Sequence, residues 1–225
     1  MPLTEHQERV ADHVVATIGS IEGIVEIAPR TPEAPPIALL HVPATEHKPF
    51  QVLISAGLST APMRVPKEVQ AELEKDGEDP APERVELLLG LPPSWPVGRP
   101  EPEHAWPLRL LAQLASFPHE AGAWFMSGHT IPNFVDGAYA PTTQMDCALL
   151  AKPRNLLDEA MTIPLPEGPA EILGVVPLYP REVELKREQG VKRLLERLEE
   201  ERVSEVLVPD REAVAGILLD LLKRT

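Results

Sequence analysis

The stretch Trp124-Phe125-Met126-Ser127-Gly128-His129-Thr130-Ile131-Pro132-Asn133 gathers residue types that are rare elsewhere in the chain. Aromatic residues make up only 4% of the sequence, yet Trp124, Phe125, Phe134 and Tyr139 all fall within or just after it. The Gly-His-Thr step is typical of a tight turn, and Ile-Pro-Asn leads the chain out of it. Large apolar rings on both sides favour a turn packed against a core. We therefore expect 128–130 to be a structural turn.

The same turn also contains the best candidate for catalysis, His129. A histidine can act as a general base, with Ser127 or Thr130 as the nucleophile and Asp136 as the orienting acid. Adjacent residues of one turn rarely reach that geometry, and the G-x-S-x-G pattern of a nucleophile elbow is absent from the sequence. A hydrolase-like enzyme is therefore kept as the alternative, and the preferred interpretation assigns no catalytic residue.

Metal and cofactor sites are not indicated by the spacing of the polar residues. His104, His119, Glu120 and His129 are spread too widely for the paired spacing of a zinc site. Cys147 is the one cysteine and lies in an apolar run, which favours a buried thiol over a metal ligand. No phosphate-binding glycine loop is present. We expect neither a metal nor a cofactor.

Composition restricts the classes of partner and the cellular compartments that can be expected for this chain. The formal net charge of the chain is −14, with 35 Asp and Glu against 21 Lys and Arg, so a nucleic-acid partner is not expected. The sequence lacks an apolar run long enough to span a bilayer, and its first residues do not resemble a secretory signal. A single cysteine suits a reducing compartment. These features predict a cytoplasmic protein that does not bind membranes.

Periodic apolar patterns predict the secondary structure. Helical spacing predicts helices at 5–18, 68–74, 107–117, 182–202 and, beginning with Asp210 as a cap, about 210–223. Short runs rich in β-branched residues predict strands at 24–28, 37–42, 51–56, 84–89, 145–150 and 171–176. The helix at 182–202 is expected to expose its charged face and to carry a Glu182/Lys186 pair. Strands and helices without regular alternation indicate an α+β fold.

Four segments in order resemble the suppressor of fused (SUFU) family. The first is Leu53-Ile54-Ser55-Ala56-Gly57-Leu58-Ser59-Thr60-Ala61-Pro62-Met63, and the second runs from Val85-Glu86-Leu87 to Pro93-Ser94-Trp95. The third is the Gly-His-Thr-Ile stretch itself. The fourth, Gly174-Val175-Val176-Pro177-Leu178-Tyr179-Pro180-Arg181-Glu182, leads into the long helix. Together they cover roughly 20–202, which resembles the single-domain bacterial members of the family.

This resemblance implies a fold and a function. It implies one SUFU-like domain over 1–225, with a mixed sheet flanked by helices and no established enzymatic activity. Animal members bind a transcription factor in Hedgehog signalling, and bacterial members are proposed immunity proteins of polymorphic toxin systems. We expect a non-enzymatic domain that binds a protein, either a toxin or a regulatory protein. The oligomeric state stays open.

Four side chains are the candidates for contact with such a partner: Trp124, His129, Tyr139 and Tyr179. Aromatic anchors are common at the centres of protein interfaces. For the tryptophans Trp95, Trp106 and Trp124, however, packing in the core or against loops is the competing interpretation.

Overall fold

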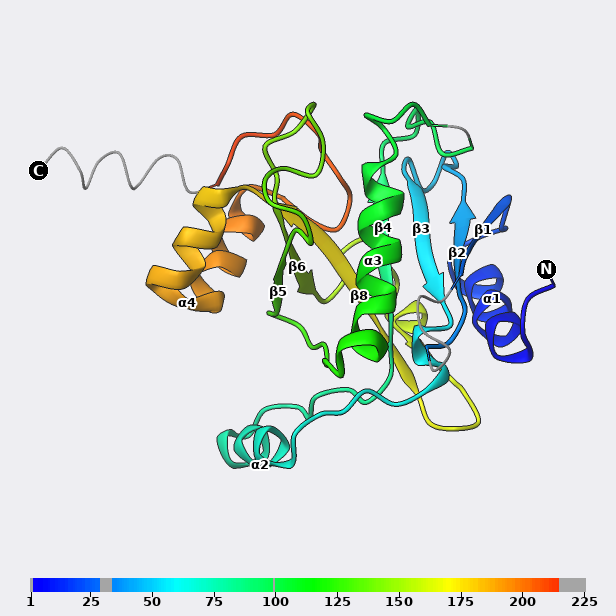
Figure 1. The fold of residues 1–225 in the computed structure, drawn as a ribbon, viewed down its shortest axis with the longest axis horizontal. Helices are drawn as coiled ribbons and strands as arrows, with labels where there is room; N and C mark the ends of the chain where they lie inside the picture. Colours follow the sequence, from blue (N-terminus) through cyan, green and yellow to red (C-terminus); the bar gives the residue numbers. More distant parts are fainter. Residues whose placement is uncertain (1, 29–33, 99, 215–225) are drawn as a thin grey trace, which may run out of the picture.

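A computed structural model describes residues 2–28, 34–98 and 100–214. The described residues form one sheet of eight strands in the order β1-β2-β3-β4-β8-β6-β5, with β7 also paired to β8 (Figure 1). The strands are β1 (Gly23–Ile27), β2 (Ile37–Val42), β3 (Gln51–Ala56), β4 (Val85–Leu91), β5 (Thr130–Pro132), β6 (Cys147–Ala151), β7 (Thr162–Ile163) and β8 (Ala170–Leu178). Strands β4 and β8 run parallel and the other pairs are antiparallel. The expected mixed sheet of an α+β fold is confirmed.

Helices cover both faces of this sheet. They are α1 (Glu5–Thr17), α2 (Lys67–Asp76), α3 (Trp106–Ala121) and α4 (Pro180–Glu200), with short 3₁₀ turns at η1 (Leu58–Thr60) and η2 (Asp158–Ala160). Helix α3 packs over the middle of one face, whereas α1 and α4 contribute to clusters on the other face (Figure 1). Helix α2 buries none of its residues and stands away from the sheet.

Strand β8 shows how side-chain alternation builds this arrangement. Leu173 and Val175 join the cluster under α3, while Ile172 and Val176 join the clusters under α1 and α4. Successive side chains of a strand point to opposite faces, so a strand covered on both sides is apolar nearly throughout. Eight of the nine β8 residues are buried, the exception being Glu171. Strand β8 lies between β4 and β6, so it joins the antiparallel strands β1–β4 on one side to β6 and β5 on the other.

The first helix begins where the capping box predicts. The Thr4 side chain accepts a hydrogen bond from the Gln7 backbone, and the Gln7 side chain accepts one from Thr4 N at 3.0 Å. The strands predicted at 37–42 and 51–56 have the bounds of β2 and β3. Strands β5 and β7 were not predicted, because two or three residues are too few to show a period.

The prediction for the long helix at 182–202 needs three corrections. Helix α4 is broken at Gly190, whose φ of 86° and ψ of 166° are not helical. Glu182 is fully buried and pairs with Arg211 instead of Lys186. The predictions of a solvated face and of a Glu182/Lys186 pair are therefore wrong at the beginning of α4, because Arg211, from a segment distant in sequence, supplies the cation that pairs with Glu182. Glycine tolerates a positive φ, which lets the second half of α4 take a new direction.

The predicted helix at about 210–223 lies, from 215 onward, outside the described residues. Its described beginning is not helical: 211–213 have no regular structure and Val214 is in a turn. Within the described ranges, no helix is long and apolar enough to cross a bilayer.

Candidate functional site

The Gly128-His129-Thr130 turn is held between β6 and α4. Gly128 N donates to Leu150 O at 2.7 Å, and Leu150 N donates to His129 O at 2.8 Å. From the other side, Lys186 Nζ donates to Gly128 O and to Thr130 Oγ1, each at 2.9 Å. These contacts support the structural role predicted for the turn.

Glycine is required in this turn for two reasons. Gly128 has a φ of 92°, a conformation that is costly for residues with a Cβ atom. A Cβ atom built there would lie only 3.2 Å from Val191 Cγ2, on the helix that covers the turn. The close approach of α4 therefore depends on the missing side chain.

The ring of His129 packs edge-on against Trp124, with their centroids 4.4 Å apart. Burial lowers the pKa of His129, a hydrogen bond to the Trp124 backbone opposes this shift, and the Lys186 ammonium adds to it. In the described part of the chain, no hydrogen bond joins this ring to Ser127 or Thr130. The catalytic arrangement of the alternative hypothesis is therefore not assembled in this structure.

The candidate metal ligands of the sequence have separate contacts. His119 Nε2 bonds to Leu58 O at 2.7 Å, and the His104 ring packs edge-on against Trp95. Cys147 is buried in β6, and burial raises the pKa of its thiol to about 11. No group of three or more His, Cys, Asp or Glu side chains in the described ranges is placed to hold a metal ion.

Tyr139 contacts the core. Its ring stacks on Trp106 with an interplanar angle of 2° and a centroid distance of 5.4 Å, and Trp106 is itself buried. Among the described residues, the buried Tyr139 hydroxyl has no hydrogen-bond partner, and burial raises its pKa. Its role in partner binding stays a prediction, as it does for Trp124 and His129.

Tyr179, the fourth candidate, lies in a surface groove of about 730 Å³. Three segments line this groove: 141–144 before β6, 179–181 where β8 leads into α4, and 209–213 near the end of the described chain. Prolines from each segment contribute to the lining, together with Arg181, Asp210 and Arg211. The groove therefore combines apolar surface with charges of both signs.

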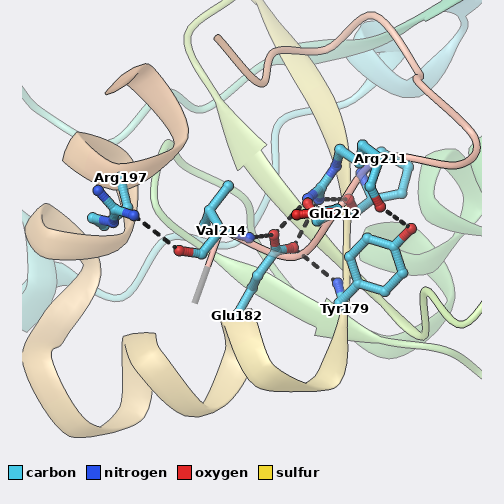
Figure 2. Close-up of polar contacts among 7 residues, drawn as sticks. Tyr179, Glu182, Arg197, Arg211, Glu212 and Val214 are labelled. Carbon is cyan, nitrogen blue, oxygen red and sulfur yellow. Dashed lines mark hydrogen bonds and ion pairs between the residues drawn. The ribbon is translucent and has the colours of Figure 1, made fainter. Parts of the chain in front are cut away.

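A buried ion pair lies next to Tyr179 (Figure 2). Arg211 binds Glu182 through both guanidinium Nη atoms, with Nη2 at 2.7 Å from Glu182 Oε2. Glu182 also accepts from Tyr179 N and Val214 N, each at 2.9 Å. Arg211 Nη2 donates in addition to Pro177 O at 2.9 Å. A buried charge needs this degree of pairing, because desolvation otherwise disfavours it.

The same arginine positions the Tyr179 ring. The guanidinium carbon of Arg211 lies 4.9 Å from the ring centroid, and the Tyr179 hydroxyl donates to Arg211 O at 2.7 Å (Figure 2). Burial raises the pKa of Tyr179, and the positive charge of Arg211 partly opposes that shift. Tyr179 therefore lines the groove with its orientation set by contacts on two sides.

The segment 203–214, here called the C-terminal strap, is also fixed at its first half. Glu205 is buried and accepts from Asn155 N at 2.9 Å and from Arg154 N at 3.1 Å. Gly90 N donates to Glu205 O at 2.8 Å, and Leu207 N donates to Gly90 O at 2.9 Å. The strap is thus tied to β4 at one end and to α4 at the other. Sequence patterns missed it because it has no period.

A third buried carboxylate, Glu86 in β4, was also missed as a polar site. Its Oε1 accepts from Gly57 N at 2.9 Å, Ser59 N at 3.0 Å and Ser59 Oγ at 2.6 Å, and its Oε2 accepts from Ser55 Oγ. His6 Nε2 lies 2.8 Å from Ser59 Oγ. The only sequence signal was an acidic residue inside an apolar strand.

Comparison with known proteins identifies the family of this fold. A family model described as Suppressor of fused protein (SUFU) matches residues 33–212. No curated protein matches the chain.

Solved structures agree with the family match. A protein described as a SUFU homologue from Neisseria gonorrhoeae is 14% identical, with a TM-score of 0.63, over 93% of this chain and 97% of that one. A chain of the Sufu–Fu complex is 16% identical, with a TM-score of 0.62, over 97% of this chain and 96% of that one. Drosophila Suppressor of Fused is 19% identical, with a TM-score of 0.55, over 85% of this chain and 46% of that one. At these identities the structures establish a shared fold.

Proposed function

The chain belongs to the suppressor of fused family, and from this membership we propose that it is a non-enzymatic protein-interaction domain that captures and masks a protein partner. One of its structural relatives was solved in the Sufu–Fu complex, in which that relative is bound to another protein. Fold alone does not fix function, so the proposal also needs a surface on this chain that suits a protein partner.

The groove beside Tyr179 is the observation that carries the proposal. Tyrosine is enriched at protein interfaces because its ring offers a large contact area with a polar end. Tyr179 lines the groove in an orientation held by Arg211, whose side chain is itself buried in the ion pair with Glu182. A surface ordered before binding loses little conformational entropy when a partner arrives. This groove therefore suits an inserted segment of a folded or extended protein.

Within this function, we propose a toxin domain as the partner and an immunity protein as the biological role. The net charge of −14 favours a basic partner, because complementary charge raises association rates and disfavours wrong partners. A nuclease domain would have the required basic surface. The proposal places the protein in the cytoplasm, where its one thiol, Cys147, would stay reduced.

Site-specific photo-crosslinking tests the groove. A benzoylphenylalanine placed at Arg181, which is exposed in the groove, should crosslink one protein from the native cell extract. The same probe at Leu157, which is 64% exposed and outside the groove, is the matched control and should not capture that protein. Equal capture by both probes would contradict the groove as the binding site.

A filter-binding assay with DNA and RNA at moderate salt tests the class of partner. We expect no retention, because the chain lacks the excess of cations that phosphate binding requires. Tight retention that resists salt would overturn the proposal of a protein partner.

A further inference from the structure

A second cavity, of about 480 Å³, lies at the beginning of α1. Residues between 4 and 9 line it, together with Pro36, Thr60 and the turn at 166–167 between β7 and β8. In Figure 1, α1 and α4 lie on opposite sides of the molecule, and none of these residues lines the groove beside Tyr179. A volume of this size is typical of a site for a small molecule or a single side chain. The proposed function does not use this cavity.

A chain of hydrogen bonds behind the cavity fixes where His6 carries its proton. Glu86 is fully buried and accepts from Ser59 Oγ at 2.6 Å, and a carboxylate can only accept. Because this contact uses the one proton of the Ser59 hydroxyl, Ser59 Oγ accepts from His6 Nε2, which lies 2.8 Å away. His6 therefore carries a proton on Nε2, and in the neutral ring its other nitrogen, Nδ1, is an acceptor.

The neutral form of this ring is favoured in the folded protein. Burial lowers the pKa of His6 below 6.5. The nearby carboxylates of Glu86 and Glu167 oppose this shift, and the cations of Arg84 and Arg9 add to it. In the described part of the chain, no hydrogen bond occupies His6 Nδ1. Since Nε2 is already used, Nδ1 is the ring nitrogen left for a ligand in the cavity.

The charges around the cavity favour a positive ligand. Arg9 lines the cavity but is paired with Glu5 at 2.8 Å. The partial positive charge at the beginning of α1 is offset by Glu5 and Glu8 in its first turn. Glu167, by contrast, is exposed and has neither an ion pair nor a hydrogen bond within the described ranges. Its carboxylate is therefore available to a cation.

We propose that this cavity binds an organic cation through a guanidinium or primary ammonium group. Such a group carries only N–H donors, and it meets acceptors at His6 Nδ1, the Glu167 carboxylate and the Thr60 hydroxyl. The charge-assisted hydrogen bond to Glu167 would contribute most of the affinity. An anion would instead meet the lone pairs of His6 and Glu167. No group of three or more His, Cys, Asp or Glu side chains among the described residues could hold a metal ion, so the cation is organic.

This site is independent of the protein-binding groove. His6 precedes the range 33–212 that the family model matches, and the two sites share no residue. Either site can therefore fail its test while the other passes.

Two probes separate the two sources of this chemistry, a free small cation and an arginine side chain of another protein. The probes are agmatine and the capped tripeptide N-acetyl-Gly-Arg-Gly-amide, each titrated into the full chain by calorimetry. At least one should bind saturably, whereas acetate should not. Tighter binding of agmatine assigns the site to a free cation, and tighter binding of the tripeptide assigns it to an arginine side chain. Saturable binding of acetate, or of neither cation, would overturn the proposal.

NMR of the unmodified chain tests the state of the ring directly. Two-bond ¹H–¹⁵N spectra at pH 7.5 should show His6 neutral with its proton on Nε2, and the Nδ1 signal should shift when the bound probe saturates. The His6 signals are those missing from the spectrum of His6→Gln. A proton on Nδ1 in the free protein would overturn the proposal.

Two variants with the same change of charge locate the site. Glu167→Gln should weaken binding of the tighter probe about tenfold, because it removes the charged acceptor from an exposed turn. Glu68→Gln, on the helix α2 that buries no residue and stands away from the sheet, should change binding less than about twofold. Equal weakening by the two variants would overturn the proposal.

Discussion

Glu182 and Glu86 are both fully buried, but the protein stabilises their charges in different ways. Glu182 binds a guanidinium through both carboxylate oxygens, and Arg211 comes from a segment 29 residues further along the chain. Glu86 instead accepts from two serine hydroxyls and two backbone amides, and in the described residues it has no ion pair. The difference matters because removing a cation leaves a bare charge, whereas neutral donors can reorient.

Breaking the ion pair should have the largest effect. Arg211→Ala leaves Glu182 buried without its cation and should lower the free energy of unfolding by about 3–5 kcal/mol. Denaturant unfolding measures this loss. The matched control is Arg193→Ala, which removes a more exposed pair with Glu196 and should cost about 0–1 kcal/mol. Equal losses in the two variants would show that burial does not distinguish these pairs.

Replacing each buried carboxylate with an amide sharpens the comparison. Glu86→Gln places an NH₂ group among donors, and should lower the free energy of unfolding by about 1–3 kcal/mol because the serine hydroxyls can rotate. Glu182→Gln leaves the guanidinium of Arg211 without its anion and should cost more, again about 3–5 kcal/mol. Thermal and denaturant unfolding of both variants test this order, and a reversed order would contradict it.

Replacing His129 tests whether the turn beside α4 contributes as much to stability as Glu86, the carboxylate held by neutral donors. His129→Ala should lower the free energy of unfolding by about 1–3 kcal/mol, through lost packing on Trp124 and a lost buried hydrogen bond. Normal unfolding of this variant together with the loss of a measured hydrolytic activity would instead support the enzyme hypothesis.

The pH dependence of stability tests the environment of His129 more finely. Folding lowers its pKa below 6.5, so the unfolded chain binds more protons between the two values. The stabilisation by His129 is therefore complete above about pH 6.5 and is lost as the pH falls toward the folded pKa. Between pH 7.5 and pH 5, the wild type should lose more stability than His129→Ala. If the wild type and His129→Ala lost the same stability over this pH range, the ring of His129 would not be held in its neutral form.

The smallest effect on stability is expected from cleavage of exposed loops, which involve neither Glu182 nor Glu86. The loop at 76–82 follows the unburied helix α2 and is mostly exposed, so limited proteolysis should cleave there and at 96–103 first. We propose that residues 1–225 form one folding unit, which predicts a single unfolding transition before and after cleavage. Two fragments that refold and melt separately would contradict this proposal.

Local patterns were enough for most of the secondary structure. The capping box at Thr4, the short runs of β2 and β3 that are rich in β-branched residues, and the apolar stripe of α3 each depend on residues within a few positions of one another. Their order, together with four recognisable segments, also indicated the family and the mixed sheet. Such features can be read from the sequence because helix and strand periods act over short distances.

Only the tertiary structure decided which residues meet in the polar sites. Nothing near Glu182 in sequence indicates that its partner is Arg211 and not Lys186, and nothing near Gly190 indicates where α4 must change direction. The groove beside Tyr179 requires three segments to meet. Buried charges find their partners through contacts between residues far apart in the chain, and no local pattern records these contacts.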